Sequence, residues 1–239
     1  MNNLILVRHG QSLWNKERRF TGWADVDLTD QGKKEAEYSA ILIKQLNIEF
    51  DAYFTSLQKR AINTLGIILN ILKKENVKIN KAFELMERNY GDLTGLNKDE
   101  MIKKHGSKQV HIWRRSFNTP PPPMSPSHTH HPSKNKNYLN IPRNKIPTSE
   151  SLKDTFDRVV PYYEKEIQPL LLSKKNIMIS AHGNSLRALC KKIFNISEKK
   201  IIDLEIPTGN PLLIKFKNSI VHEYKYLDLK RAKKILINV

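Results

Sequence analysis

The sequence predicts an α/β three-layer sandwich, with a mostly parallel central sheet and helices on both faces. Three observations predict it. Short apolar runs alternate with segments of helical periodicity. Two of these runs, LVRHG and ISAHG, end in the same His-Gly pair. The 239 residues suffice for one domain with a sizeable core. We therefore expect a single domain, residues 1–239, with a Pro-rich lid-like insertion at about residues 118–149.

The N-terminal part is expected to follow a β-α-β-α order. Its apolar runs are short enough for buried strands, and the segments between them carry apolar residues at helical spacing. Thr29 and Asp30 are available to cap the first helix. The strand candidates are residues 3–7, residues 50–55 and the segment from Lys78 onward, and the helix candidates are residues 32–46 and 58–73.

The C-terminal part repeats the alternation. Residues 149–172 have the pattern of one long helix, which we expect to bend at Pro161. The stretch NIMISAHGNSLRALCKKIF predicts a strand, a turn and a helix. LLIKF and IVHEYKY predict a final, antiparallel pair of strands joined by a turn at residues 217–219, and the last dozen residues form a basic tail compatible with a helix.

Composition indicates a soluble protein of the cytoplasm. Hydrophobic residues make up 39% of the chain, and no apolar run approaches the roughly 20 residues that cross a bilayer. The N-terminus lacks the basic region and cleavage site of a signal peptide. Cys190 is the single cysteine and has no partner for an internal disulfide. We therefore expect no membrane association.

The net charge of +17 has three interpretations: a nucleic-acid partner, a phosphorylated small substrate, or a lysine-rich solvated surface. Lysines are scattered along nearly every segment, without a zinc-finger, zipper or RNP-like pattern. A nucleic-acid-binding module would therefore rest on charge alone, and we expect no nucleic-acid partner. We favour the solvated surface, whose positive field would also attract a multiply anionic substrate.

The insertion at residues 118–149 interrupts the alternation of strand-like and helix-like segments. It holds eight of the twelve prolines and has no periodicity, which indicates either a functional cover or a disordered excursion. His128, His130 and His131 could suggest a metal site. No cysteine or acidic residue stands near them, so we predict no metal here.

His9 and His182 each follow an apolar strand at its carboxyl end, where α/β proteins place their ligand crevices. A neutral imidazole can attack phosphorus without first losing a proton, provided that an acceptor holds its other nitrogen. Forked arginine side chains, an amide and glycine amides suit phosphoryl oxygens. The candidates are Arg8, Arg60, Asn15 and the backbone amides around Gly10 and Gly183.

The order of motifs along the chain resembles one known family. Over nearly its whole length, the chain is similar to the cofactor-dependent phosphoglycerate mutases of the histidine phosphatase superfamily. The stretches that carry the resemblance are LVRHGQSLWN, FTGWADVDLTDQG, TSLQKRAINT, ERNYGDLTGLNK, WRRSF, AHGNSLRAL and IPTGNPLL.

The resemblance implies a role for each matching residue. His9 becomes phosphorylated, with Arg8, Asn15, Arg60 and His182 around the phosphoryl group. Gly183 and Asn184 follow in the motif as substrate-binding residues, and the Gly183 amide helps to hold the phosphate. Glu87 matches the acid/base residue, although standing alone it would be taken for an exposed ion-pair partner of Arg88. The positions for the substrate carboxylate and second phosphate are Thr21, Gly22, Tyr90, Lys98, Arg114 and Arg115.

The resemblance also implies the reaction. It is the interconversion of 2- and 3-phosphoglycerate through a phosphohistidine primed by 2,3-bisphosphoglycerate, without a metal, in a homo-oligomer, most simply a homodimer. The alternative among enzymes is a broader phosphomonoesterase on the same fold.

Overall fold

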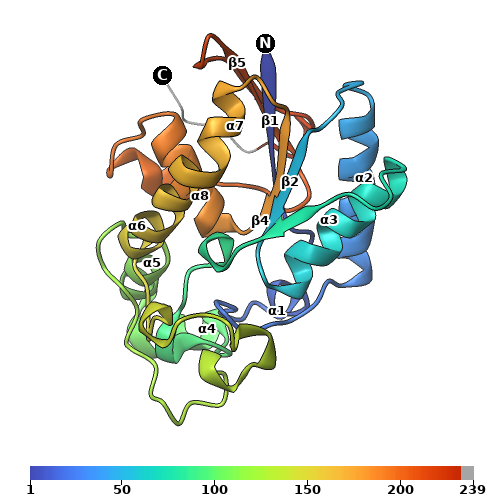
Figure 1. Ribbon diagram of the computed structural model, residues 1–239. Helices are drawn as coiled ribbons and strands as arrows, with labels where there is room; N and C mark the ends of the chain where they lie inside the picture. Colours follow the sequence, from blue (N-terminus) through green and yellow to red (C-terminus); the bar gives the residue numbers. More distant parts are fainter. Residues whose placement is uncertain (233–239) are drawn as a thin grey trace.

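A six-stranded sheet runs through the middle of the protein (Figure 1), and the structure, a computed structural model, describes residues 1–232. The strand order is β3-β2-β4-β1-β5-β6. The first four strands in this order are parallel, whereas β5 is antiparallel to β1 and β6 to β5. The strands are β1 (Asn2–Arg8), β2 (Ala52–Thr55), β3 (Ile79–Lys81), β4 (Ile177–Ala181), β5 (Leu212–Lys217) and β6 (Ile220–Tyr226).

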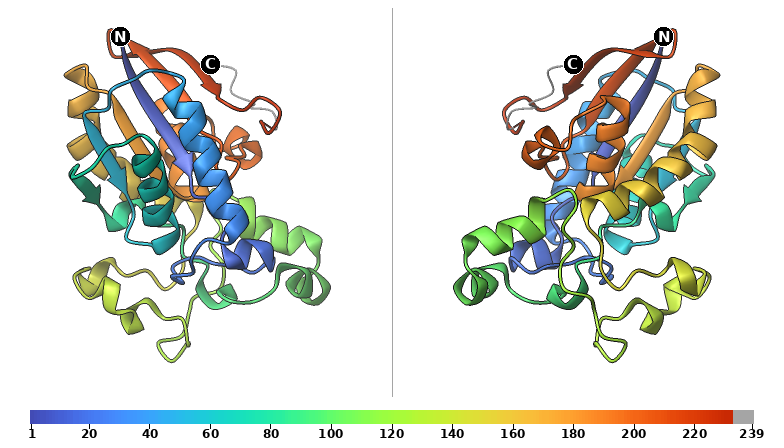
Figure 2. Two further views of the ribbon diagram at one scale, coloured as in Figure 1. Left: turned by 90° about the vertical axis from the view of Figure 1, so that its right-hand side faces the viewer. Right: turned by 90° about the vertical axis from the view of Figure 1, so that its left-hand side faces the viewer.

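Helices cover both faces of this sheet, as Figures 1 and 2 show. One face carries α2 (Asp30–Lys44) and α3 (Lys59–Ile71), and the other α6 (Leu152–Tyr162), α7 (Gln168–Leu172) and α8 (Gly183–Ile193). Successive residues of β1 pack into the hydrophobic cores on opposite faces of the sheet, because side chains alternate along a strand. Leu4 and Leu6 pack in one cluster of buried residues, whereas Ile5 and Val7 pack in the other. The predicted α/β three-layer sandwich is confirmed.

The N-terminal elements agree with the prediction to within a few residues. Helix α2 begins at Asp30, and its N-cap Thr29 accepts a hydrogen bond from the Gly32 amide at 3.1 Å through Oγ1. Helix α3 follows Gln58, and the segment after Lys78 contains the short strand β3 and a 3₁₀ turn, η1 (Phe83–Leu85).

The long helix predicted for residues 149–172 is divided and shorter. It begins at Leu152, because Ser151 is its N-cap and accepts a hydrogen bond from the Asp154 amide. The helix passes through Pro161 and widens directly afterwards into a π-helical segment, η6 (Tyr163–Ile167), before α7. A proline lacks the N–H that continues the helical ladder, which accounts for an irregularity at this point.

The C-terminal elements follow the prediction up to the tail. Helix α8 begins directly after His182, and β5 and β6 are joined by a turn in which Asn218 and Ser219 both have positive φ. Of the predicted basic tail, residues 228–232 form no helix, and residues 233–239 lie outside the described residues. A further 3₁₀ segment, η7 (Lys200–Asp203), lies between α8 and β5.

Several short elements near the carboxyl ends of the parallel strands were not predicted. Phe20, Leu93, Met101 and Val110 form a small core of their own there. Its pieces are too short or too polar for a clear periodicity in the sequence. The elements are α1 (Leu13–Lys16), η2 (Gly91–Leu93), α4 (Lys98–His105) and α5 (Ser107–Arg115).

The insertion at residues 118–149 contains neither α-helix nor strand, only three 3₁₀ turns. It folds back onto the domain: Tyr138 is buried and donates a hydrogen bond from its hydroxyl to the Trp23 carbonyl at 2.9 Å. Met124 and Ile141 are buried as well. The turns are η3 (Pro132–Lys134), η4 (Lys136–Tyr138) and η5 (Arg143–Lys145).

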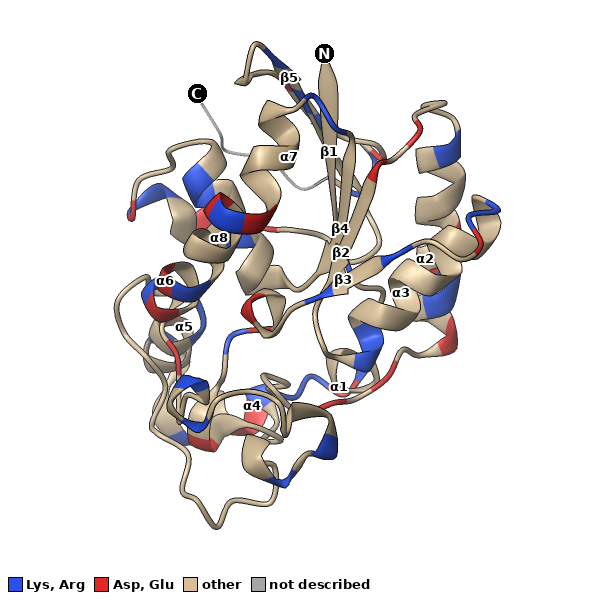
Figure 3. Ribbon diagram, viewed as in Figure 1, with Lys and Arg blue, Asp and Glu red and all other residues tan. Residues whose placement is uncertain are grey.

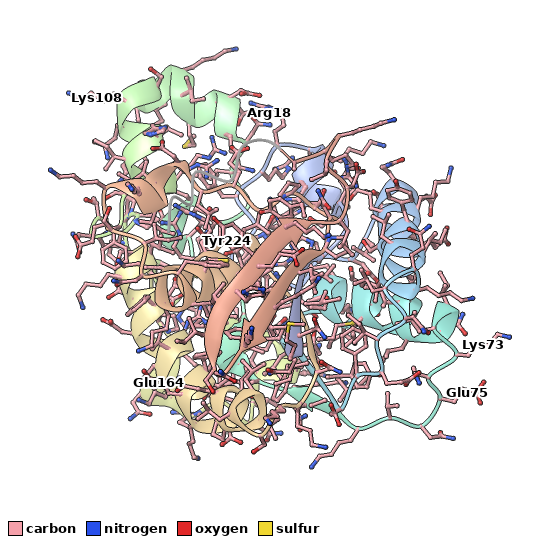
Figure 4. The ribbon with its side chains drawn as sticks, turned by 90° about the horizontal axis from the view of Figure 1, so that it is seen from above. Arg18, Lys73, Glu75, Lys108, Glu164 and Tyr224 are labelled. Atoms are coloured by element: carbon pink, nitrogen blue, oxygen red, sulfur yellow. The ribbon has the colours of Figure 1, made fainter. Side chains whose placement is uncertain are left out.

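Basic residues are spread over helices on both sides of the sheet and over the loops below it (Figure 3). Viewed from above, the labelled Lys73, Lys108 and Glu164 lie at the periphery on different elements (Figure 4), and all three are exposed. This distribution is consistent with the solvated lysine-rich surface. Within residues 1–232, no helix has the length and apolar character needed to cross a membrane.

Candidate active site

The ends of β1 and β4 bring the two predicted histidines together. These strands are parallel neighbours, with Arg8 opposite Ala181, so the residues that follow them leave the sheet side by side. The His9 and His182 rings have their centroids 5.0 Å apart at an interplanar angle of 60°. Both side chains are buried. Two residues far apart in the chain therefore form one centre.

The His9 ring is held in one tautomer. Its Nδ1 lies 2.7 Å from the Gly10 carbonyl oxygen. A carbonyl only accepts, so Nδ1 carries the proton and Nε2 presents a lone pair. The Arg60 Nε–H approaches this lone pair at 3.3 Å. Burial, followed by the positive charges of Arg60 and Arg8, holds the pKa of His9 well below its usual value, so the ring is neutral at neutral pH.

His182 is oriented from the opposite side of its ring. Its Nε2 lies 2.7 Å from Ser56 Oγ, which also accepts a hydrogen bond from the Gln58 amide. Ser56 Oγ keeps its own proton and one further lone pair, so this contact holds the ring in either tautomer. Nδ1 is buried and has no hydrogen-bond partner in the described part of the chain. The pKa of His182 is lowered by burial and then by Arg60.

Glu87 is buried, which excludes the interpretation as an exposed ion-pair partner of Arg88. Its Oε1 accepts from the Arg88 amide at 2.8 Å, the Asn184 amide at 3.2 Å and Asn184 Nδ2 at 2.9 Å. For residues 1–232, every hydrogen bond recorded to this carboxylate falls on Oε1. Oε2 therefore accepts none of these three hydrogen bonds.

A cavity of about 530 Å³ opens beside these groups. Arginine and lysine dominate its wall, whereas Glu87 and Glu205 are its acidic members among the described residues. Two of the predicted site residues do not line it: Gly10, and His182, whose ring contacts His9. The others line it: Arg8, His9, Asn15, Thr21, Gly22, Arg60, Glu87, Tyr90, Lys98, Arg114, Arg115, Gly183 and Asn184.

The Pro-rich insertion contributes none of its described residues, 118–149, to this cavity. Residues 204–208, which carry the start of the IPTG motif, line it instead. The covering role expected for the insertion therefore stays a prediction.

Arg60, Arg8 and Asn15, the polar side chains nearest the histidines, already form some hydrogen bonds within the protein. Arg60 gives Nη1 to the Ala24 carbonyl and Nη2 to the Gly22 carbonyl, both at 2.9 Å, so only Nε faces His9. Arg8 gives Nη1 to the Ile206 carbonyl, and its buried Nε has no partner within residues 1–232. Asn15 accepts from the Ser12 amide through Oδ1.

The outer part of the cavity is strongly electropositive. Burial lowers the pKa of Lys98 to about 8, opposed by Tyr90 and reinforced by Arg114. Burial tends to raise the pKa of Tyr90, but the Arg88 guanidinium, 4.6 Å from the ring centroid, outweighs it and lowers this pKa to about 8. Burial also lowers the pKa of Arg114. Arg115 pairs with Glu205 at 2.8 Å.

Gly10 is a packing residue, whereas the backbone amides around it were proposed from the sequence as donors to the phosphoryl oxygens. Its amide was expected near the anion, but it donates to Thr64 Oγ1 at 3.1 Å. A Cβ at this position would lie 2.1 Å from the Gly32 carbonyl oxygen. Gly10 is therefore required by the close approach of the β1 end to α2.

Three further arginines line the cavity and were missed: Arg19, Arg187 and Arg231. Arg187 lies inside the AHGNSLRAL stretch, three residues after Asn184, which was the one available signal. Arg19 and Arg231 stand in polar segments without a motif.

The histidines of the insertion form ring contacts instead of a ligand cluster. His130 lies edge-on to Trp14 at 5.0 Å between centroids, and His131 Nδ1 lies 2.7 Å from Ser133 Oγ. Across residues 1–232, no group of three or more His, Cys, Asp or Glu residues has an arrangement that could hold a metal.

Comparison with known proteins agrees with this geometry. The model of the histidine phosphatase superfamily (branch 1) matches residues 4–130. A 2,3-bisphosphoglycerate-dependent phosphoglycerate mutase of Pelagibacter ubique (strain HTCC1062) is 52% identical over 238 residues, covering 99% of this chain and 100% of the relative. The protein of that name from Hyphomonas neptunium (strain ATCC 15444) is 50% identical over 233 residues, 97% of each chain.

Solved structures support the same fold. Mycobacterial hydrolase 1 superposes with a TM-score of 0.69 at 17% identity, covering 98% of this chain and 100% of that one. With half of its residues shared with full-length relatives and the two histidines in contact, the chain belongs to the histidine phosphatase superfamily and, within it, to the 2,3-bisphosphoglycerate-dependent phosphoglycerate mutases.

Proposed function

We propose that this chain is a glycolytic and gluconeogenic mutase that interconverts 2-phosphoglycerate and 3-phosphoglycerate through a phosphohistidine at His9. The observation that carries the proposal is the contact of His9 with His182, 5.0 Å between ring centroids, beside the buried Glu87 carboxylate in a cation-lined cavity. A phosphoryl group needs a nucleophile, charge compensation and a proton donor for the departing oxygen, and these residues supply all three.

His9 acts as the nucleophile. Its neutral ring offers the Nε2 lone pair, while the Gly10 carbonyl holds Nδ1. As the new N–P bond forms, the P–O bond to the substrate oxygen breaks, and the Arg60 Nε–H turns from Nε2 to the phosphoryl oxygens. Arg8 Nε, the Gly183 amide at the start of α8 and His182, in the tautomer that protonates Nδ1, compensate the remaining charge.

Glu87 moves the proton. When the phosphoryl group transfers to His9, Oε2 gives a proton to the departing oxygen. When a substrate hydroxyl attacks the phosphohistidine, the same oxygen removes the hydroxyl proton, and the N–P bond breaks. Because Oε1 is fixed by three N–H donors, Oε2 is presented without rotation of the carboxylate.

The cavity has the donors that a bisphosphorylated primer requires. Arg8 Nε, Thr21 Oγ1 and His182 Nδ1 are buried polar atoms without partners in the part of the chain that the structure describes. Leaving such an atom unpaired costs about 1–3 kcal/mol, which an anionic oxygen would offset. When bound, 2,3-bisphosphoglycerate supplies the phosphoryl group that primes His9.

The outer cationic residues suit the rest of the substrate. A carboxylate and a second phosphate need several donors away from the reacting centre, and forked guanidinium groups bind such anions well. We assign this role to Thr21, Gly22, Tyr90, Lys98, Arg114 and Arg115, with Asn15 and Asn184 nearer the phosphoryl group. We also propose that the protein is cytoplasmic and that it forms a homodimer. Light scattering after size-exclusion chromatography tests the oligomeric state.

The deciding experiment combines an activity assay with mass spectrometry. Wild-type protein should interconvert the two phosphoglycerates only after addition of the primer and should gain one phosphoryl group on His9. His9→Ala should lose both, whereas His222→Ala, a change of an exposed histidine on β6, should lose neither.

Two outcomes would contradict the proposal. One is full turnover without primer or in His9→Ala. The other is hydrolysis of an unrelated phosphate ester at rates rivalling mutase flux, which would favour the phosphomonoesterase.

A further inference from the structure

The side-chain amide of Asn184 lies between a guanidinium and a carboxylate. Its Oδ1 accepts from Arg187 Nη1 at 2.9 Å, and its Nδ2 donates to Glu87 Oε1 at 2.9 Å. Nδ2 also lies 3.3 Å from the Tyr90 hydroxyl. A guanidinium only donates and an ionised carboxylate only accepts, so these two neighbours together fix which end of the amide faces which.

Arg187 is held in place for this contact. It lies on α8 three residues after Asn184, which puts both side chains on one face of the helix. Its Nη2 donates to the Ile201 carbonyl of η7, and its side chain is buried. In the described part of the chain it makes no ion pair with a carboxylate. Burial, with Arg115 and Arg88 adding to it, lowers its pKa to about 9.

Without Arg187, the amide would lose its orientation. Asn184 could rotate and present Oδ1 to the Glu87 carboxylate, an acceptor facing an acceptor. Glu87 would lose one of the three donors on Oε1 and keep only the backbone amides of Arg88 and Asn184. The carboxylate would then be less fixed, with one hydrogen bond fewer to Oε1.

We propose that Arg187 is a positioning residue for the proton transfer: it fixes the Asn184 amide, which holds Glu87 Oε1 so that Oε2 meets the reacting hydroxyl. The inference rests on the proposed function and adds a residue to it. Arg187 acts through Asn184, and it is not assigned a contact with substrate.

The first test is the kinetics of Arg187→Met, which removes the donor and the charge but retains a long side chain. The kcat of primed mutase turnover should fall about 10- to 100-fold, the effect of one hydrogen bond to a charged group, with little change in KM. The acid limb of the kcat/KM profile should move to higher pH, because Glu87 Oε1 has lost one of its donors. Arg187→Lys should recover part of both effects.

A double-mutant cycle separates positioning from direct binding. In an Asn184→Ala background, Arg187→Met should cost almost nothing further, because the residue through which Arg187 acts is already missing. Arg19→Met is the matched control: it removes another cation of the same cavity, with no contact to Asn184, and should leave the acid limb in place.

A measurement on the free protein supplements the kinetics. The Asn184 side-chain amide, assigned by the loss of its signals in Asn184→Ala, should show slow hydrogen exchange in wild-type protein and fast exchange in Arg187→Met. If Arg187→Met does not fold, Arg187→Lys carries the same test, with smaller effects of the same sign.

Failure of this inference is distinct from failure of the proposed function. Absence of primed turnover in wild-type protein would contradict the function. A rise in KM alone, an undiminished cost of Arg187→Met in the Asn184→Ala background, or unchanged amide exchange would contradict the role of Arg187 in a mutase that works.

Discussion

Removal of the Glu150 carboxylate should destabilise the protein and misplace Glu87. Arg158 forms a double contact with Glu150, Nε to Oε1 at 2.6 Å and Nη2 to Oε2 at 2.9 Å. The exposed fractions of the two side chains are 13% and 3%. Arg158 also donates to the carbonyls of Glu84, Met86 and Glu87 at 2.6–3.1 Å. This buried pair therefore fastens the segment that carries Glu87 to α6.

The magnitude follows from the burial of the pair. Breaking a buried ion pair from one side costs about 3–5 kcal/mol, and the partial exposure of Arg158 puts Glu150→Leu near the lower end, about 3 kcal/mol. For a chain of this length, that loss corresponds to a fall in Tm of about 6–12 °C. The double variant Glu150→Leu/Arg158→Met should not recover the loss: it leaves no charge unpaired, but the carbonyls of Glu84, Met86 and Glu87 lose their donor.

Equilibrium urea unfolding measures the free energy, and mutase kcat measures the placement of Glu87. The control is Asp157→Ala, which breaks an exposed ion pair with Lys153 on the same helix and should cost about 0.5 kcal/mol or less. The reasoning is refuted if Glu150→Leu costs no more than this control.

Three further outcomes are expected. Gly10→Ala should lose about 3 kcal/mol or more in urea unfolding, because its Cβ would meet the Gly32 carbonyl, whereas Gly66→Ala in α3, with open space around it, should gain about 0.5–1 kcal/mol. The His9 ring should not titrate by NMR between about pH 6 and 8, and the free energy of unfolding should fall as pH drops through about 6.5, because the unfolded chain takes up a proton there and the folded one does not. The KM for phosphoglycerate should rise between low salt and about 0.5 M salt, as screening weakens the field of the cavity.

The chemistry at the strand ends could be predicted from the sequence because it depends on local signals. An apolar run that ends in His-Gly specifies both a strand and the place of its last side chain. The convergence of His9 and His182 then needs only that β1 and β4 be neighbours, and the structure confirms it. The glycine of a His-Gly pair is harder to interpret from the sequence. The amides around Gly10 were expected beside an anion, whereas Gly10 packs against the backbone of α2.

The supporting residues could not be predicted, because burial is not visible in a residue type. Nothing in the sequence marks Arg158 or Arg187 as buried, yet both side chains are largely buried and donate to backbone carbonyls of other segments, Glu84 and Ile201. The insertion has no periodicity, and the contact of Tyr138 with Trp23 spans more than a hundred residues. Only the three-dimensional packing contains this information.

The unpaired polar atoms of the protein explain why such support is needed. Arg8 Nε, Thr21 Oγ1 and His182 Nδ1 are buried at or beside one cavity without partners in the described residues. At about 1–3 kcal/mol each, they lower the stability of the free protein by an amount comparable to a large part of a domain's net stability. A site prepared for an anion can persist only if its cations are fastened elsewhere. The bonds of Arg60 and Arg187 to carbonyls provide this, and they hold positive charge around the cavity before any substrate arrives.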